Sequence, residues 1–344
     1  MYELLLQYGL FLAKSITVLV VILLVIGSLF SVIREAREHA HERLEIKNIN
    51  DRFRHMADIL NHELLGRDEF KRLHKARDKE EKHRQKAIKK GQEKARPRIF
   101  TLDFDGDLNA SPVASLREEI SAVLQVASKE DEILLRLESE GGLVHSYGLA
   151  ASQLTRIRDR GIPLTVVVDK VAASGGYLMA CVADKILAAP FAIIGSIGVV
   201  AQLPNFNRVL KKHEIDLELH TAGQYKRTLT MFGENTDEGR AKFREELEDT
   251  HTLFKKFVTE NRPTLDIEKV ATGEHWFGTR ALSHRLVDEL ITSDDYLLKR
   301  SKDADIYEIK YRERRSLSDR LSQGLVKVGT GLRSGLEKAW SRQV

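Results

Sequence analysis

Short apolar runs alternate with helical stripes in the middle of the chain, and this pattern predicts most of the fold. Residues 99–104, 133–137 and 164–168 are β-branched or apolar runs typical of buried strands. Apolar residues at helical spacing follow the first two runs, over residues 115–127 and 144–160. Strict alternation of strands and helices indicates parallel βαβ units, so we predict an α/β fold.

The pattern predicts further elements toward the C-terminus. They are a helix over 177–182, a strand from about Ile186, a helix over 205–212, a strand over 217–221, a long helix over 237–259 and a helix–strand unit over 276–290. The long helix carries an apolar stripe that includes Thr250, Phe254 and Phe257.

Small residues follow the third predicted strand, where the chain enters the next helix. Residues 172–176 read Ala-Ala-Ser-Gly-Gly, which lets the backbone turn sharply and a substrate come close. Ser174 offers a nucleophilic hydroxyl beside the unpaired N–H groups of a helix N-terminus. This position suits acyl-transfer chemistry.

Three stretches differ in composition from the α/β domain, which we assign to residues 98–300. Residues 16–33 carry no charge, so residues 1–33 are predicted to form an N-terminal transmembrane anchor that is not cleaved. Residues 34–97 are a charged helical or disordered linker, whose basic end leaves a coiled-coil or lipid-headgroup contact open. Residues 301–344 are a basic amphipathic tail, expected to bind a membrane surface or another subunit.

Composition excludes some classes of protein. The net charge of +4 is too small to indicate nucleic-acid binding, so no nucleic-acid partner is expected. The single cysteine, Cys181, rules out an internal disulfide framework and a CxxC metal site, and we predict that it packs in the core. We expect no metal and no cofactor.

A nucleophilic serine needs a base. Half of the 12 histidines lie in the charged linker, and none of the others follows a strand beside a carboxylate. A lysine with a lowered pKa can replace histidine. Lys226, in a turn of small residues, is a candidate, although a lysine in a loop is usually a solvated surface charge.

Five ordered motifs resemble the signal peptide peptidase A family of membrane proteases (peptidase family S49), most closely its SohB-like branch. They are ESEGG (138–142), VDKVAASGGYLMACVADKI (168–186), GSIGVV (195–200), AGQYKR (222–227) and TGEHWFGTRALSHRLVDEL (272–290). Glu140 stands where the family usually has a proline.

The resemblance implies a ClpP/crotonase-like α/β fold and an ATP-independent serine endopeptidase, acting on signal-peptide remnants or misfolded envelope proteins. It makes Ser174 the nucleophile and Lys226 the general base. The N–H groups of Gly175 and Gly142 would form the oxyanion hole, and the Ser196 hydroxyl would orient the lysine amine. The expected partners are a peptide or unfolded protein, membrane lipid and further copies of the chain, since family members with one repeat share each site between adjoining subunits.

The family resemblance and the distribution of basic residues predict opposite membrane orientations. The family places its catalytic domain in the periplasm, anchored by a single pass in the inner membrane. One lysine precedes the apolar run and six basic residues closely follow it, which favours a cytoplasmic domain. We expect the periplasm, because long domains translocate largely regardless of charge.

Two other functions fit part of the sequence. A crotonase-fold enzyme would use the paired N–H groups on an acyl-CoA thioester, but such enzymes rarely need an anchor and usually place an acid at this turn. A non-enzymatic membrane scaffold would work through the linker and tail. The intact Ser174, Lys226 and Ser196 are evidence against that loss of activity.

Overall fold

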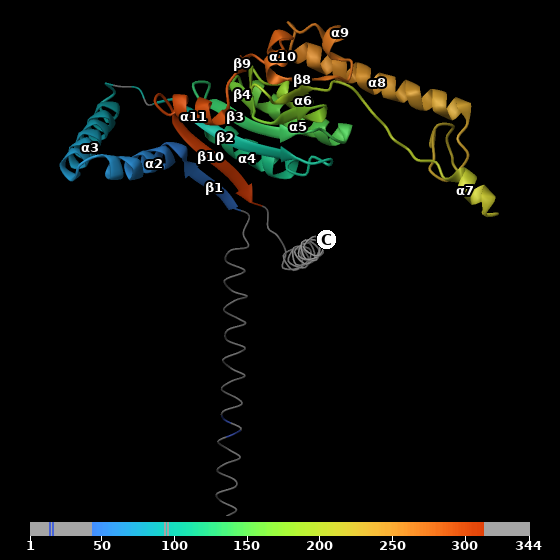
Figure 1. Cartoon of the computed structure of the whole chain (residues 1–344), viewed down its shortest axis with the longest axis horizontal. Coiled ribbons are helices and arrows are strands. Elements are labelled where there is room, and N and C mark those ends of the chain that lie inside the picture. The colour runs from blue at the N-terminus through green and yellow to red at the C-terminus, as the bar shows by residue number, and fades with distance from the viewer. Residues whose placement is uncertain (1–13, 15, 17–42, 93, 95, 313–344) are drawn as a thin grey trace, which may run out of the picture. The chain divides into compact units, whose positions relative to one another are not determined.

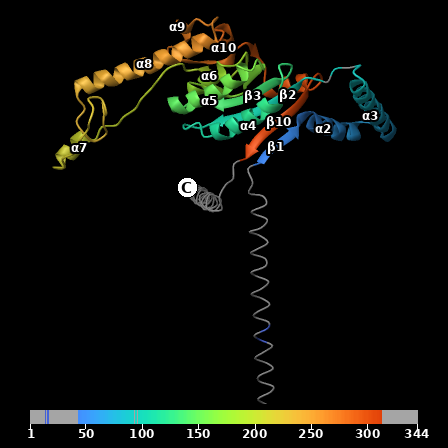
Figure 2. The same ribbon diagram turned by 180° about the vertical axis from the view of Figure 1, so that it is seen from behind.

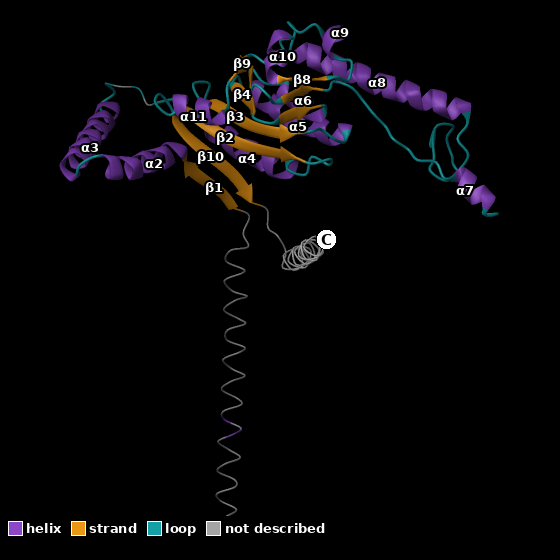
Figure 3. Ribbon diagram, in the orientation of Figure 1, coloured by secondary structure: helices purple, strands orange, loops and turns teal. Residues whose placement is uncertain are grey.

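The computed structural model describes residues 14, 16, 43–92, 94 and 96–312 (Figure 1). Contacts divide the chain into a unit of residues 45–310 and a second unit of residues 1–44 and 311–344. The predicted α/β architecture is confirmed (Figure 3). Apart from Lys14 and Ile16, the predicted membrane anchor lies outside the described residues. Among the described residues, no helix combines the length and the apolar character needed to cross a bilayer.

The strands form one largely parallel sheet in the order β1-β10-β2-β3-β4-β6-β9, and β5, β7 and β8 branch from β3. Only β7 and β8 pair in antiparallel fashion among the described pairings. The strands are β1 (Arg43–Asn48), β2 (Arg98–Gly106), β3 (Glu132–Ser139), β4 (Leu164–Val168), β5 (Val171–Ala173), β6 (Lys185–Ala188), β7 (Ile193–Gly195), β8 (His275–Phe277), β9 (Glu289–Leu290) and β10 (Asp305–Arg312).

Helices cover both faces of the sheet. They are α2 (Ile49–Leu64), α3 (Arg67–Lys89), α4 (Val113–Val126), α5 (Val144–Arg158), α6 (Gly175–Ala180), α7 (Asn207–Lys212), α8 (Asp237–Asn261), α9 (Ile267–Val270), α10 (Gly278–Ser283) and α11 (Ser293–Arg300). Apolar residues of α4, α5 and α6 fill the larger core on one face. Ile49 of α2 and Leu297 of α11 pack on the other face. Both ribbon views show α8 running beside α6 (Figures 1 and 2).

The functional edge of the sheet forms where β3 ends. The first part of β3 pairs with β4, but its last residue, Ser139, pairs with Ala172 of β5. The two glycine-rich turns that follow β3 and β5 therefore meet at one edge. In parallel α/β sheets this carboxyl edge is where ligands bind.

Several sequence predictions need correction or addition. The strand predicted over 217–221 is wrong, since these residues lie in an irregular segment between α7 and α8. Leu217 and Leu219 alternate as in a strand, but no neighbouring strand pairs with them, and both side chains are exposed. The sequence did not predict β1 or β10, which pair beside β2. Helices α2 and α3 occupy most of the region expected to be a helical or disordered linker.

Cys181 packs in the core as predicted. Its side chain is fully buried after α6. Burial raises the pKa of its thiol far above the usual value. The thiol is therefore held in its unreactive, protonated form.

Candidate active site

Ser174 is held in an unusual backbone conformation between β5 and α6. Its φ is +52° and its ψ is −118°, a region that residues with a Cβ rarely adopt. Its N–H donates to the carbonyl of Gly195 (2.8 Å), and its own carbonyl accepts from the N–H of Leu178 (3.0 Å). A strand-to-helix turn of this kind projects a nucleophile at the start of a helix, and its strain is typical of functional sites.

The turn after β3 packs directly against the turn that carries Ser174. Gly141 has a φ of +93°, and a Cβ at this position would lie 2.7 Å from the Gly175 nitrogen and 2.8 Å from the Cβ of Ser174. A Cβ on Gly142 would lie 2.1 Å from the carbonyl oxygen of Leu108. Both positions therefore require glycine. Glu140, at the site of the usual proline, is exposed.

Each of the two glycine turns also carries a backbone N–H group that could bind an oxyanion. Within the described part of the chain, no acceptor receives the N–H of Gly142 or that of Gly175. Unpaired N–H groups are uncommon and costly when they are removed from water. Both belong to the turns that meet beside Ser174, so they are available to stabilise a developing oxyanion.

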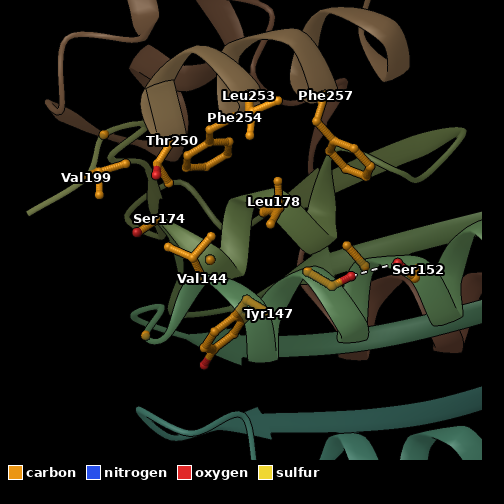
Figure 4. Close-up of a pocket in the computed structure, with 15 residues that line it drawn as sticks. Val144, Tyr147, Ser152, Ser174, Leu178, Val199, Thr250, Leu253, Phe254 and Phe257 are labelled. Atoms are coloured by element: carbon orange, nitrogen blue, oxygen red, sulfur yellow. Dashed lines mark hydrogen bonds between the residues drawn. The ribbon is translucent and has the colours of Figure 1, made fainter. Parts of the chain in front are cut away.

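An apolar cavity of about 380 Å³ opens beside Ser174 (Figure 4). It lies between α5, α6 and α8. Its lining residues are Gly142, Val144, Tyr147, Gly148, Ala151, Ser152, Ser174, Gly175, Leu178, Gly198, Val199, Thr250, Leu253, Phe254 and Phe257. The cavity has the volume and the apolar walls of a binding site for a hydrophobic side chain.

The cavity contains no group that could act as a base for Ser174. None of its lining residues is a histidine, lysine, aspartate or glutamate. Within residues 43–92 and 96–312, no hydrogen bond involves the Ser174 hydroxyl. Ser196 lies next to Gly195, the acceptor of the Ser174 N–H, and its own N–H donates to Glu274 (2.7 Å). Ser196 is thus close to the nucleophile in the fold.

Lys226 lies elsewhere in the structure. It is exposed, in the segment between α7 and α8, which Figure 1 draws beside the first turns of α8. The ammonium of Lys242 lies 5.3 Å from the ring centre of the adjacent Tyr225. From Lys242 to Thr250, the first α8 residue of the cavity, the helix rises about 12 Å. The chain therefore does not bring its own Lys226 to its own Ser174.

Tyr147 is a residue of the site that the sequence analysis did not identify. It is fully buried in α5, and its hydroxyl donates to the carbonyl of Asp107 (2.8 Å) and contacts the hydroxyl of Ser139 (2.5 Å). Burial raises the pKa of this phenol, while the Ser139 hydrogen bond acts in the opposite direction. Only its place in the helical pattern of residues 144–160 could be read from the sequence, and that pattern indicates core packing.

The sequence pattern predicted the α8 wall of the cavity only as the apolar face of a long helix, not as part of a binding site. Thr250, Phe254 and Phe257 were identified in sequence as one face of a long helix, and they line the cavity in the structure. The structure brings most of the predicted site residues together. Ser174, Gly175 and Gly142 line one cavity. Ser196 follows Gly195, whose carbonyl accepts from the Ser174 N–H, whereas Lys226 does not line the cavity.

Family models match nearly the whole described chain. Residues 3–154 match the model of the peptidase family S49 N-terminal region, and residues 156–307 match the model of peptidase family S49. The ClpP/crotonase-like α/β fold implied by the motifs agrees with these matches. They favour neither an acyl-CoA enzyme nor a non-enzymatic scaffold.

Similar proteins cover the same length. The chain is 52% identical over 322 residues to "Probable protease SohB" of Haemophilus influenzae, covering 92% of this chain and 91% of that protein. It is 49% identical over 334 residues to "Probable protease SohB" of Buchnera aphidicola subsp. Acyrthosiphon pisum, covering 95% of this chain and 98% of that protein. A solved structure of the membrane-bound stomatin-specific protease 1510-N with a substrate peptide aligns with a TM-score of 0.42 and 13% identity, covering 68% of this chain and 99% of that one.

Proposed function

The chain belongs to peptidase family S49, and from that premise we propose that it is a serine endopeptidase whose nucleophile is Ser174 and whose general base is Lys226 of an adjoining copy. The observation that carries the proposal is the position of Ser174. It is strained, half-buried, beside two unpaired glycine N–H groups and at the wall of an apolar cavity. No ATP-binding step is part of the mechanism.

The proposed reaction proceeds through an acyl-enzyme. The Lys226 amine takes the proton from the Ser174 hydroxyl as Oγ attacks the scissile carbonyl carbon. The N–H groups of Gly175 and Gly142 donate to the resulting oxyanion, an effect worth about 3 kcal/mol per donor in measured cases. The lysine then returns the proton to the leaving nitrogen as the C–N bond breaks, and water hydrolyses the ester by the same route. Ser196 orients the lysine amine.

The separation of Lys226 from Ser174 supports a site shared between subunits. Residues 200–232, which include α7 and the segment that carries Lys226, also expose many apolar side chains for their length. They include Val200, Phe206, Val209, Ile215, Leu217, Leu219, Tyr225 and Phe232. Exposed apolar groups in one segment are typical of a surface that another protein covers. A ring of copies would cover this segment and would bring each Lys226 to a neighbouring Ser174.

The cavity supports a preference for peptides with an apolar side chain at the cleaved residue. Val144, Leu178 and Phe254 line it, and it contains no charged group that would attract a basic or acidic side chain. An extended peptide would lie along the Gly141–Gly142 turn, with alternate side chains directed into apolar pockets. Signal-peptide remnants and misfolded envelope proteins contain many such segments.

We also propose that residues 16–33 anchor the enzyme in the inner membrane with its domain in the periplasm. The uncharged run of the sequence supports the anchor. Fusion of a reporter enzyme to the C-terminus, active on only one side of the membrane, tests the orientation. A cytoplasmic signal would overturn the periplasmic assignment and leave the proposed chemistry unaffected.

Active-site labelling tests the proposed chemistry. The full-length protein in detergent is treated with a fluorophosphonate and mapped by mass spectrometry, and hydrolysis of an apolar peptide is measured in parallel. Ser174→Ala and Lys226→Ala are expected to lose both label and turnover. Ser152→Ala is the matched control, because Ser152 lines the same cavity but its hydroxyl donates to the Gly148 carbonyl (2.8 Å). Peptide turnover that survives in Ser174→Ala would overturn the proposal.

A further inference from the structure

A directed chain of hydrogen bonds runs behind the two glycine turns. The N–H of Gly141 donates to the Ser139 hydroxyl (3.0 Å), and the Tyr147 hydroxyl donates to the carbonyl of Asp107 (2.8 Å). A phenol has one proton, so the 2.5 Å contact between Ser139 and Tyr147 must have Ser139 as its donor. Every proton in the series therefore points from the Gly141 turn toward Asp107.

This series of hydrogen bonds is buried, and its donors and acceptors cannot be reversed. Ser139 is 2% exposed and Tyr147 is 0% exposed. The carbonyl of Asp107 can only accept and the N–H of Gly141 can only donate, so the direction is fixed at both ends. Hydrogen bonds in such a series strengthen one another in a low-dielectric interior. The Asp107 end is itself held, because its carboxylate accepts from the N–H groups of Asn109 (3.1 Å) and Ser111 (2.8 Å).

The same tyrosine contacts the second turn through its ring. A Cβ built on Gly175 would lie 2.4 Å from the ring carbon Cγ of Tyr147, so the ring packs on the backbone of Gly175. The ring also meets Phe104 edge-on, with 6.3 Å between ring centres. One side chain is thus linked to both glycine turns. Its ring packs directly on Gly175, and its hydroxyl is connected through the Ser139 hydroxyl to the N–H of Gly141.

We propose that Tyr147 is a positioning residue for the oxyanion hole, acting through Ser139 to hold the Gly142 N–H in register with the Gly175 N–H. This inference rests on the proposed serine-peptidase function and extends it. Donors that are fixed before reaction stabilise the transition state more than the bound substrate. The hydroxyl of Tyr147 should therefore affect the chemical step, and the ring should affect folding.

The test separates the hydroxyl from the ring. Tyr147→Phe keeps the ring on Gly175 and removes the series of hydrogen bonds, and Ser139→Ala breaks the series at its next member. Each variant should lower kcat by about tenfold or more, because loss of one oxyanion donor costs 100- to 1000-fold and this change only displaces one. The KM for an apolar peptide should stay within about twofold. The Ki of a peptide aldehyde, whose adduct places its oxygen in the hole, should rise by the factor by which kcat falls.

A double variant and a distant tyrosine provide the controls. The double variant Tyr147→Phe/Ser139→Ala should be as active as the less active of the two single variants, since both changes interrupt the same series of hydrogen bonds. Tyr296→Phe removes another partly buried phenol, which donates to Glu132 (2.5 Å) away from the cavity, and it should retain the wild-type kcat. If Tyr147→Phe does not fold, Ser139→Ala alone carries the test.

The outcomes distinguish this inference from the function on which it rests. A rise in KM with unchanged kcat, a wild-type kcat in both single variants, or losses that multiply in the double variant would overturn the role of Tyr147. Equal peptide turnover by the wild type and Ser174→Ala would instead overturn the serine-peptidase mechanism itself.

Discussion

The aromatic ring of Tyr147 occupies the space that any side chain on Gly175 would need, since a Cβ there would lie 2.4 Å from the ring. Gly175→Ala should therefore displace the ring, the start of α6, or both. Overpacking in a buried site typically costs about 1–3 kcal/mol. We expect a lower Tm and, because the N–H of Gly175 is a proposed oxyanion donor, a fall in kcat of about 100-fold or more. Thermal unfolding and peptide hydrolysis measure the two effects.

Gly148 is the matched control for this substitution. It lines the same cavity from α5, but a Cβ built there meets nothing within 4 Å. Because glycine is unfavourable in a helix interior, Gly148→Ala should raise the free energy of unfolding by about 0.5–1 kcal/mol. If both glycine variants lose stability equally, the tight contact with Tyr147 is not the cause.

Mixing two inactive variants tests whether the site is shared between subunits. Ser174→Ala retains Lys226, and Lys226→Ala retains Ser174. In a ring built at random from equal amounts, about one interface in four would join an intact serine to an intact lysine. We therefore expect the mixture, after subunit exchange, to recover about a quarter of wild-type hydrolysis. A site formed within one chain would recover none.

The cavity wall on α8 should set the size of the preferred side chain. Phe254→Ala removes a ring from the wall, and so should favour peptides with a larger apolar residue at the cleaved position. A change of this size in a hydrophobic pocket alters kcat/KM ratios by about 10- to 100-fold. The ratio for phenylalanine over alanine peptides measures it. Lys256→Ala, an exposed α8 position outside the cavity, should leave the ratio unchanged.

The parallel core was predictable from sequence because its strands are continuous apolar runs. Leu164–Val168 is buried at every residue, and its predicted bounds are those of β4. The edge strands gave no such signal. In β10, buried residues are interspersed with partly exposed ones, and several of its residues are charged. Half of the residues of β1 are charged. Each of these strands lies at or near an edge of the sheet, where one face is solvated. Strands β1 and β10 are neighbours in the sheet although residues 49–304 separate them in the chain, and a local pattern does not encode such a pairing.

The candidate site was predictable only as far as its turns. Small residues at Gly141, Gly142 and 172–176 point to close backbone approach, and the structure brings these turns together. Tyr147 could not be identified because its importance depends on contacts with three distant segments. The separation of Lys226 from Ser174 likewise depends on how the segment between α7 and α8 packs, which no local motif specifies.

Acid should weaken the fold through Asp131, which is buried beneath the start of β2. Its side chain is 4% exposed. Burial alone would raise the pKa of this carboxyl, but hydrogen bonds from the Arg98 guanidinium (2.6 and 3.0 Å) and from Ser128 (2.7 and 2.9 Å) outweigh it and hold the pKa well below its usual value. The folded state therefore binds the proton more weakly than the unfolded chain does.

The sign of the pH effect follows from that difference. Above about pH 4, the usual pKa of an aspartate, the carboxylate is charged in both states and its stabilisation is complete. As the pH falls below about 4, the unfolded chain takes up the proton first, and the contribution is progressively lost. Asp131→Asn should cost about 2 kcal/mol at pH 7, and the deficit should shrink as the pH falls toward 3.

Urea unfolding of wild type and Asp131→Asn at steps between pH 7 and pH 3 measures this deficit. Asp159→Asn is the matched control, because Asp159 is exposed and its carboxylate has no partner among the described residues. It should follow the wild type at every pH. A deficit in Asp131→Asn that stays constant down to pH 3 would show that lost packing, and not the charged hydrogen bonds from Arg98, accounts for the destabilisation.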